Sequence, residues 1–514
     1  MPVDLPTEAL GDRHLRGFDP KQKQQFYAGR VRVQTSVVVA ETRTGQMILW
    51  WLTNLLTRQF GVVRQIELDV PDSAMLPGIA LFGHQATLHQ TLLDTAVKIA
   101  TNRISVTTKA LDGADVVIHI GPRFSGGTER DFAIWGEGWR CAAAATLDLP
   151  SDDGSIAVGP MLAATVGAAE VFQRITNWRG EGREPRPPFY FSAWDGNTAS
   201  EWAALTIGPD IRPLAIEPFY LCGAGAVGQA LVATLAYFVD RSGHAVILDG
   251  DPLDRTNLNR YCLAHHQSPS GKAEACKAVL ETGAFTVDAE PNFWAAYQRR
   301  PFPRTKSPNL NADEAAYKYR LLISCVDKNG PRHELQNFWP RVILGASTSG
   351  LTAKVSRYDC VTGECLKCSN PLPTVLTIEE EAAALRALTQ SEREKALSEL
   401  KPEHAAVVRS YLEQSSCGHA AEQFLTELGQ IRRREFSVGF VSVSSGVFLA
   451  VALVQHAWGQ RELFSDAANH FSFSFLSRKS GHEFFLREPS CDCAGGGGQF
   501  FRQLWINSAT SPLL

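Results

Sequence analysis

One pattern of strand, turn, helix and strand occurs twice in this chain of 514 residues. The first copy begins with "VQTSVVVAETRTGQMILWWLTNLL" and the second, about 180 residues later, with "AIEPFYLCGAGAVGQALVATLAYF". In both copies an apolar run leads through a turn into a helical stretch, and a second apolar run then ends in Asp. Strands that alternate with helices build a mostly parallel, doubly wound sheet. The pattern therefore predicts two Rossmann-like α/β domains.

Further elements recur in the same order. The short strand "ADVVIHIGP" matches "YRLLISCVD", "GWRCAAAATL" matches "WPRVILGAST", and the long helix in "SIAVGPMLAATVGAAEVFQRI" matches that in "FSVGFVSVSSGVFLAVALVQHAW". Any two α/β domains share some such features, but the common order of four elements favours a duplication. We therefore expect an internal pseudo-dimer within one chain, which makes a monomer the simplest state.

The duplication suggests domain boundaries. The first domain is expected at 1–180, and the connector at 181–217 is rich in Pro, Gly and Trp and is expected to be ordered. The second domain is expected at 218–370 and 435–514. It is interrupted at 371–434 by a charged, helical insertion that has no counterpart in the first copy.

Composition excludes several classes of protein. Apolar content of 44% and charged content of 20% are ordinary for a soluble globular protein. The formal net charge of −4 offers no basic surface, so nucleic acid is not an expected partner. The start "MPVDLPTEALGDRH" lacks the apolar core of a signal peptide, and the two most apolar windows are short and rich in Ser or Gly. We expect a cytoplasmic protein without membrane association.

The two copies differ at the turn that precedes their first helix. In the second copy this turn carries Gly223, Gly225 and Gly228, which let the backbone approach a phosphate at the helix N-terminus. In the first copy it reads "ETRTGQ", and the carboxylate of Glu41 would repel a phosphate. The second copy is predicted to bind a nucleotide, and the first to be structural.

The residues beyond the glycine loop bear on which nucleotide is bound. Asp249 lies 21 residues past Gly228, which suits a ribose hydroxyl in either an NAD or an ATP site. Two cations near a glycine loop suit a triphosphate better than the pyrophosphate of NAD. The polar side chains that follow Asp249 are Asp251, Asn257, Asn259, Arg260 and Lys272.

A third apolar run, "LLISCVD", ends in Asp327. In an open parallel sheet this position faces the same ligand crevice as the glycine loop, and a carboxylate opposite a triphosphate is a natural Mg²⁺ ligand. Asp327 could also cap a helix that starts in "DKNGPRHELQ", and the two roles are compatible.

These motifs resemble the signature of the ubiquitin-activating enzyme superfamily, which includes the ThiF and MoeB proteins. That signature is a glycine loop, D-x-D-x-x-x-x-x-N-L-x-R-Q, a Lys about a dozen residues later, and a strand ending in Asp. The chain reads "DGDPLDRTNLNRY", so it departs only at Tyr261, where Gln is usual. The resemblance implies two adenylation domains, the first inactive and the second active.

The resemblance also implies roles for these residues. Asp249 would hold the ribose of ATP, Arg260 and Lys272 its phosphates, and Asp327 the Mg²⁺. The chemistry is consistent, since a carboxylate can form an acyl-adenylate only where cations stabilise the charge on the leaving pyrophosphate and the reactants are held in line. The complete expected nucleotide site is Gly223, Gly225, Gly228, Asp249, Asp251, Asn257, Arg260, Lys272 and Asp327.

Four of the eleven cysteines form two tight pairs, Cys365 with Cys368 and Cys491 with Cys493. The first pair, C-x-x-C, is expected on a hairpin. Four thiolates from two such pairs suit a closed structural Zn²⁺ site. Two unrelated thiol pairs, or a redox motif, are the alternatives. The resemblance implies zinc at these two places, although the second pair is usually C-x-x-C rather than C-x-C.

The insertion carries a candidate nucleophile, Cys417, in "YLEQSSCGHAAEQF". A reachable cysteine that ionises can capture an activated acyl group as a thioester. The resemblance places the catalytic cysteine between the first zinc pair and the last core helix, where Cys417 lies. His419 is a possible base. An ordinary cysteine at a helix end is the alternative for Cys417, and Cys360, at an expected strand end, is the second candidate nucleophile.

The resemblance implies as partners a ubiquitin-like protein and a ubiquitin-conjugating enzyme. A cation from the first domain's N-terminal region, such as Arg16, could reach the γ-phosphate. The roughly twenty residues after Cys493 leave no room for the ubiquitin-fold domain of eukaryotic activators. The chain thus resembles compact activators of bacterial ubiquitin-like conjugation operons, some of them antiviral. A sulfur-transfer adenylyltransferase, a scaffold with a relic nucleotide site and a dehydrogenase are the competing functions.

Overall fold

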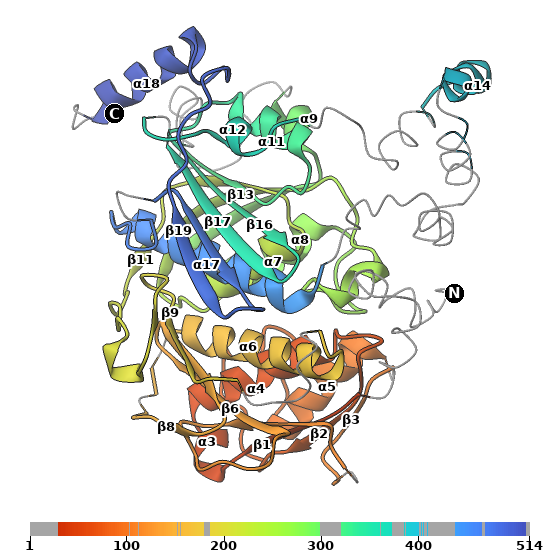
Figure 1. Cartoon of the computed structure of the whole chain (residues 1–514), viewed down its shortest axis with the longest axis vertical. Coiled ribbons are helices and arrows are strands. Elements are labelled where there is room, and N and C mark those ends of the chain that lie inside the picture. The colour runs from red at the N-terminus through yellow and green to blue at the C-terminus, as the bar shows by residue number, and fades with distance from the viewer. Residues whose placement is uncertain are drawn as a thin grey trace. The chain divides into compact units, whose positions relative to one another are not determined.

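The structure of the chain is a computed structural model, and it describes the residues given at the end of this paragraph (Figure 1). The chain divides into two compact units, one formed by Met1–Asn370 with Ser437–Leu514 and the other by Pro371–Phe436. The described residues are 29–101, 103–110, 113–151, 153–154, 156–178, 186–298, 320–359, 361–372, 385, 387–399, 402, 405, 409, 437–464 and 468–509.

The larger unit holds two mixed sheets. The first has the strand order β10-β9-β7-β6-β4-β1-β2-β3. Its strands are β1 (Gly29–Thr35), β2 (Val63–Asp69), β3 (Ser105–Thr107), β4 (Val116–Ile120), β6 (Asp131–Glu137), β7 (Arg140–Ala144), β9 (Phe189–Ser192) and β10 (Thr198–Ala199). Its helices are α3 (Val37–Ala40), α4 (Arg43–Leu56), α5 (Leu88–Ala100) and α6 (Val158–Ile175). A separate two-stranded ribbon pairs β5 (Arg123–Phe124) with β8 (Leu147–Asp148).

The second sheet has the order β11-β13-β12-β15-β16-β17-β18-β19, and β14 pairs with β13. Its strands are β11 (Leu214–Ala215), β12 (Phe219–Cys222), β13 (Arg241–Leu248), β14 (Phe285–Glu290), β15 (Leu321–Ser324), β16 (Val342–Ser349), β17 (Thr352–Asp359), β18 (His470–Ser474) and β19 (Lys479–Glu483). Its helices are α7 (Ala226–Ala236), α8 (Lys272–Leu280), α9 (Trp294–Gln298), α11 (Asn329–Gln336), α12 (Leu366–Ser369), α17 (Gly439–Ala457) and α18 (Gly496–Ala509).

The two sheets repeat one strand order. From β3 to β6 in the first sheet and from β14 to β16 in the second, five strands run parallel in the chain order 3-2-1-4-5. Three antiparallel strands then follow in each sheet. The mostly parallel α/β architecture expected from the sequence is therefore confirmed.

One predicted match between the copies was wrong. "GWRCAAAATL" contains β7, which occupies the position of β17, whereas "WPRVILGAST" contains β16, which occupies the position of β6. The physical reason is that β6 and β7 are both short, buried and apolar, and they are joined by a tight hairpin. Their apolar runs are nearly continuous, so sequence alone did not separate them.

The start of the first copy also differs from expectation. Strand β1 ends at Thr35, and the following valines form the single helical turn α3, N-capped by Ser36. Helix α4 then begins at Arg43, so most of the expected turn "ETRTGQ" is its first turn. In the expected connector, β9 pairs with β7 and β10 pairs with β9, so both strands extend the first sheet.

Helices from the two halves pack against each other in the larger unit. Helix α17 lies against α7 and α6, and α6 in turn lies against α4 (Figure 1). The hydroxyl of Ser444 donates to that of Thr165 at 2.9 Å, and the rings of Phe172 and Phe440 are 5.6 Å apart. Among the described helices α17 alone is long and apolar enough to cross a membrane, but 89% of its apolar window is buried, as in a core helix.

The smaller unit is described only in part. Helix α14 (Gln390–Glu399) is rich in charged residues, and the side chain of Leu397 is buried. Its Glu394 pairs with Arg409 at 3.0 Å.

Candidate functional site

The glycine loop joins β12 to α7, and its geometry requires glycine. Gly223 has a φ of +96°, which other residues rarely adopt, and a Cβ there would lie 2.8 Å from the backbone of Cys325. A Cβ on Gly228 would lie 2.2 Å from the carbonyl oxygen of Gly223. Gly225 is the N-cap residue of α7. The loop therefore brings backbone close to the N-terminus of a buried helix, as phosphate binding requires.

Asp249 directly follows β13 and faces this loop. Its carboxylate accepts hydrogen bonds from the backbone N–H of Ala224, at 2.8 Å, and from that of Asp251, at 3.0 Å. Burial raises the pKa of Asp249, although Lys272 and the two amide donors act in the opposite direction. Asp249 thus connects the end of β13 to the glycine loop.

Lys272 supplies a buried cation at the same place. It begins α8, and its Nζ lies 3.0 Å from Asp251 and 3.6 Å from Asp249. Burial lowers the pKa of Lys272, but Tyr261 and the two carboxylates outweigh this effect and raise the pKa above its ordinary value. Lys272 therefore stays charged at neutral pH.

The segment that carries Arg260 has a defined local structure. A 3₁₀ helix spans Arg255–Asn259, and Asp254 and Asn257 form a capping box at its start. The side chain of Asn257 accepts a hydrogen bond from the backbone N–H of Asp254 at 3.0 Å. In this structure Asn257 therefore shapes the segment.

The Arg260 guanidinium is buried and held on several sides. It donates to the carbonyl of Thr256 at 3.1 Å and to Oδ1 of Asn259 at 2.8 Å. It also lies 5.0 Å from the ring centroid of Tyr261, and Nζ of Lys272 lies 5.7 Å from the same centroid. The two predicted cations therefore converge on one aromatic ring.

A residue of the first half supports this segment. Arg58, just past the end of α4, donates to the carbonyls of Leu258, Cys262 and Ala264 at 2.7, 3.0 and 2.8 Å. Its Nε donates to Oδ1 of Asn54 at 2.7 Å. Burial lowers the pKa of Arg58 to about 9. Sequence reasoning missed this residue because nothing near it resembles a nucleotide motif.

Asp327 lies in the loop between β15, which ends at Ser324, and α11, which begins at Asn329. Strands β13, β12 and β15 are adjacent and parallel, so Asp249, Gly223 and Asp327 follow their strands at one edge of the sheet. The N-cap residue of α11 is Lys328, so the alternative in which Asp327 caps this helix is not realised. Arg332, whose Nε donates to the carbonyl of Val326 at 3.1 Å, interacts electrostatically with Asp327.

The corresponding position in the first half is filled by a carboxylate of the chain itself. Asp153 accepts hydrogen bonds from the backbone N–H groups of Arg43, at 3.2 Å, and Thr44, at 2.9 Å, in the first turn of α4. Glu41, which the sequence suggested would repel a phosphate, is instead the exposed C-cap residue of α3. Asp153 lies about 110 residues along the chain, so the sequence did not reveal its role.

The four paired cysteines come together in the second half. The Sγ atoms of Cys365 and Cys368 are 3.7 Å apart, those of Cys365 and Cys491 are 3.7 Å apart, and those of Cys368 and Cys493 are 3.4 Å apart. All four lie within 4.8 Å of one another. A tetrahedron with Zn–S bonds of about 2.3 Å has S–S edges of about 3.8 Å, so the cluster fits a metal of that size.

The local structure around the cysteines differs from the expected hairpin. The first pair lies at α12, a single helical turn whose N-cap is Cys365, in the segment that follows β17. Lys367, inside C-x-x-C, pairs with Asp492, inside C-x-C, at 2.6 Å. This ion pair holds the two cysteine loops together.

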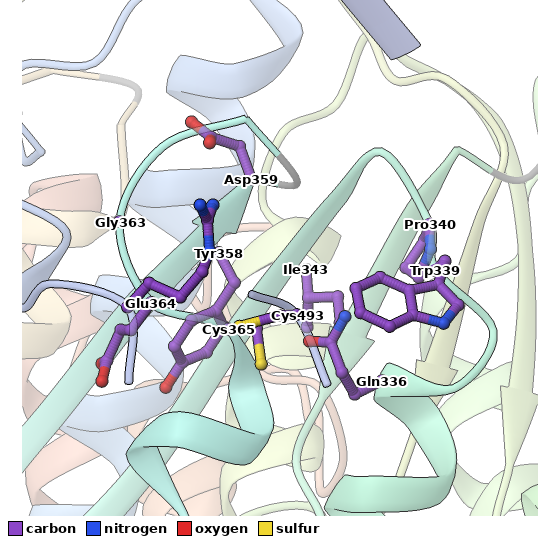
Figure 2. Close-up of a pocket in the computed structure, with 11 residues that line it drawn as sticks. Gln336, Trp339, Pro340, Ile343, Tyr358, Asp359, Gly363, Glu364, Cys365 and Cys493 are labelled. Carbon is purple, nitrogen blue, oxygen red and sulfur yellow. The ribbon is translucent and has the colours of Figure 1, made fainter. Parts of the chain in front are cut away.

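A small cavity lies beside this cluster, and Figure 2 shows Cys365 and Cys493 next to each other at its wall. It has room for about 10 Å³, roughly one water molecule, so it cannot take a substrate. Its lining is Gln336, Trp339, Pro340, Ile343, Tyr358, Asp359, Gly363, Glu364, Cys365, Arg487 and Cys493.

Several predicted residues lie outside the described part of the chain. These are Arg16, Cys360, Cys417 and His419.

Known proteins resemble this chain over different lengths. Residues 30–183 match the family described as the BilD N-terminal domain. The bacterial E1-like protein BilD of Collimonas sp. (strain OK412) is 29% identical over 175 residues, which are 32% of this chain and 36% of that protein. The uncharacterized protein y4jF of Sinorhizobium fredii (strain NBRC 101917 / NGR234) is 24% identical over 481 residues, which are 88% of this chain and 86% of that protein.

Among solved structures, that of E. coli MccB with succinimide matches with a TM-score of 0.34 and 14% identity, over 55% of this chain and 66% of that one. The matched region thus spans about a third of BilD and slightly less than two thirds of MccB. The family match lies in the first half of the chain, outside the motifs gathered at the carboxyl edge of the second sheet. The chain is therefore similar to bacterial E1-like proteins of the ubiquitin-activating-like superfamily, and its residues 30–183 match the BilD N-terminal domain.

Proposed function

We propose that this protein activates the C-terminus of a ubiquitin-like protein by adenylation with ATP. The observation that carries the proposal is the meeting of Arg260 and Lys272 on one buried ring beside the glycine loop. Two fixed cations at a helix N-terminus suit a triphosphate. The similarity to the bacterial E1-like protein BilD supports the same conclusion.

Each residue of the nucleotide site has a proposed role. The carboxylate of Asp249 takes the ribose hydroxyls of ATP, while Lys272 and Arg260 take the phosphates, close to the loop of Gly223, Gly225 and Gly228. Asp251 orients Lys272 through their 3.0 Å ion pair. Asn257 holds the 3₁₀ helix that precedes Arg260. Asp327 is the proposed ligand of Mg²⁺, which would neutralise phosphate charge when bound.

The proposed reaction is an in-line displacement at phosphorus. An oxygen of the substrate carboxylate attacks the α-phosphorus of ATP, the bond to the bridging oxygen of the β-phosphate breaks, and pyrophosphate leaves with the electron pair. Lys272 and Arg260 stabilise the charge that accumulates on the leaving group. The product is an acyl-adenylate, whose carbonyl carbon is a good electrophile.

We also propose that the two halves form a pseudo-dimer in which the first domain, 1–180, is catalytically inactive and the second, 218–370 with 435–514, is active. The shared strand order of the two sheets supports the duplication. The carboxylate of Asp153 at the N-terminus of α4 supports an inactive first domain, because it takes the place that a phosphate would need. In this scheme 181–217 is the connector.

The four cysteines are proposed to hold a structural Zn²⁺. Thiolate ligands at tetrahedral separations, drawn from two loops that an ion pair joins, are typical of closed sites without a position for substrate. The ion would fix both loops at the end of the second sheet and take no part in adenylation.

Beyond adenylation, Cys417 in the proposed insertion 371–434 is the proposed thioester nucleophile. Its thiolate would attack the carbonyl carbon of the adenylate, forming a C–S bond and releasing AMP with the electrons of the broken C–O bond. Transfer to a conjugating enzyme would follow, in the cytoplasm, as in compact bacterial conjugation operons, some of which are antiviral.

ATP–pyrophosphate exchange tests the proposed reaction. The chain is incubated with ATP, Mg²⁺ and a candidate ubiquitin-like protein, and exchange is expected only when the partner's C-terminal carboxylate is intact. Exchange without any partner protein would contradict the proposed substrate. Asp327→Ala should abolish exchange, and unchanged exchange in this variant would rule out its metal role.

The thioester step has a separate test. A reductant-sensitive adduct should form in the wild-type chain and be absent from Cys417→Ala, while exchange persists in that variant. An adduct that survives Cys417→Ala would show that another cysteine is the nucleophile. Exchange without any adduct in the wild-type chain would instead indicate a sulfur-transfer type of adenylyltransferase.

A further inference from the structure

The ring of Tyr261 occupies the centre of the proposed nucleotide site. The residue is 7% exposed, and it follows Arg260 directly in the chain. A Cβ placed on Gly225 would lie 3.4 Å from the Tyr261 hydroxyl oxygen and 3.8 Å from Cζ. The hydroxyl end of the ring therefore lies against the N-cap residue of α7.

Two cations flank the same ring. The Arg260 guanidinium lies 5.0 Å from its centroid, and Nζ of Lys272 lies 5.7 Å from it. Both distances fall within the range of about 6 Å for cation–π attraction. The ring thus lies close both to the glycine loop and to the two groups that we assign to the phosphates.

The hydroxyl of Tyr261 has no hydrogen-bond partner among the residues that the structure describes. Although the residue as a whole is nearly buried, its hydroxyl oxygen is not among the fully buried polar atoms without a partner, so a ligand can reach it. The surroundings favour an anionic partner, since Lys272, Arg260 and the amides at the start of α7 all favour negative charge.

We propose that the Tyr261 hydroxyl donates a hydrogen bond to the phosphate chain of ATP at the N-terminus of α7. This inference rests on the proposed adenylation function and adds a nucleotide-binding residue at the one position where the chain departs from the superfamily signature.

The backbone around Tyr261 is fixed well enough for this role. Its N–H donates to the carbonyl of Asn257 at 2.9 Å, and its own carbonyl accepts from the N–H of Ala264 at 3.0 Å. Arg58 binds the carbonyls on both sides of it, at Leu258 and Cys262. The hydroxyl is therefore presented by a rigid segment, which lowers the entropic cost of binding a ligand.

Tyr261→Phe removes the hydroxyl and keeps the ring. The full-length chain is titrated with ATP in the presence of Mg²⁺ and, separately, with adenosine, which has no phosphates. The dissociation constant for ATP should rise about tenfold, the size expected for one hydrogen bond to a charged group, while that for adenosine stays unchanged. Tyr220→Phe, which removes a hydroxyl from the β12 core, is the matched control and should leave both constants unchanged.

The outcomes separate this inference from the proposed function. If the wild-type chain binds ATP and Tyr261→Phe binds it within twofold of wild type, the inference is wrong and the proposed function stands. If Tyr261→Phe weakened the binding of ATP and of adenosine equally, the inference would also be wrong, because the hydroxyl would then not act on the phosphates. If the wild-type chain binds no ATP, both the proposed function and the inference fail.

Discussion

At the scale of single residues, the proposed site depends on charges held in fixed places with little exposure. Asp249 and Lys272 lie 3.6 Å apart, and both are mostly buried. Removing one member of such a pair leaves the other charged and without compensation. Effects on ATP binding are therefore expected to accompany effects on stability, and controls must separate the two.

Arg58 gives a prediction about support across the two halves. Arg58→Met removes four hydrogen-bond donations and leaves the carbonyls of Leu258, Cys262 and Ala264 without this partner. We expect the free energy of unfolding to fall by about 3 to 5 kcal/mol, and ATP–pyrophosphate exchange to fall at temperatures where the variant is still folded. Arg123→Met, at an exposed arginine of β5, is the control and should change neither quantity. A fully active Arg58→Met would contradict the supporting role.

These residues differ in how far the sequence predicts them. Gly223, Asp249, Lys272 and Asp327 were predicted because each follows a strand or begins a helix in a recognisable order. Arg58 was not predicted, because its partners are backbone carbonyls about 200 residues away. Every residue has a backbone carbonyl, so the sequence cannot show which carbonyls accept these hydrogen bonds.

At the scale of elements, the cysteine loops show how two short segments can form one site. Lys367 and Asp492 join them, and the four thiols lie at distances that suit a tetrahedral metal. Their order in the sequence predicted the grouping. The hairpin that was expected for the first pair is instead a single turn of helix, which C-x-x-C permits equally well.

The metal prediction follows from this geometry. We expect one zinc per purified chain by atomic absorption, and none in Cys368→Ser, because three thiolates hold the ion much less tightly. The melting temperature of Cys368→Ser should fall by several degrees, and a strong chelator should lower that of the wild type to a similar value. Cys141→Ala, at a buried cysteine of β7, should keep its zinc. Wild-type protein without any bound metal would refute the site.

At the scale of the whole chain, the larger unit consists of two sheets with one strand order, of which only the second has the glycine loop and its cations. The sequence predicted the repeat from its periodicity and the difference between the copies from their turns. The group that fills the first turn, Asp153, could not be predicted, because it comes from a distant loop.

The difference between the two helix N-termini predicts that each chain binds one nucleotide. The helix N-terminus of the first half already binds a carboxylate, so a phosphate would have to displace Asp153. Calorimetric titration with ATP should therefore give a stoichiometry of one. Two equivalent sites per chain would contradict an inactive first domain.

An arginine cluster links the halves and predicts a pH dependence. Glu170 on α6 is buried and pairs with Arg174, Arg186 and Arg478, of which Arg478 belongs to the second half. Burial opposes its ionisation, but the three guanidinium groups prevail and lower the pKa of Glu170 to about 2.

Because the folded-state pKa is lower than that of the unfolded chain, this stabilisation is present above about pH 4.5 and is lost as the pH falls toward 2. Between pH 5 and pH 3 the free energy of unfolding, measured with urea, should fall by about 2 kcal/mol more in the wild type than in Glu170→Gln. If the free energies of unfolding of the two proteins changed in parallel with pH, the lowered pKa of Glu170 would be contradicted.

The most direct test of the central claim, that the second half adenylates a carboxylate, is ATP–pyrophosphate exchange in the wild type and in Lys272→Met. Lys479→Met, on β19, serves as the control. We predict exchange that depends on the ubiquitin-like protein in the wild type and the control, and a loss of at least a hundredfold in Lys272→Met, about 2.7 kcal/mol of transition-state stabilisation. Exchange in Lys272→Met equal to that of the wild type would contradict the account.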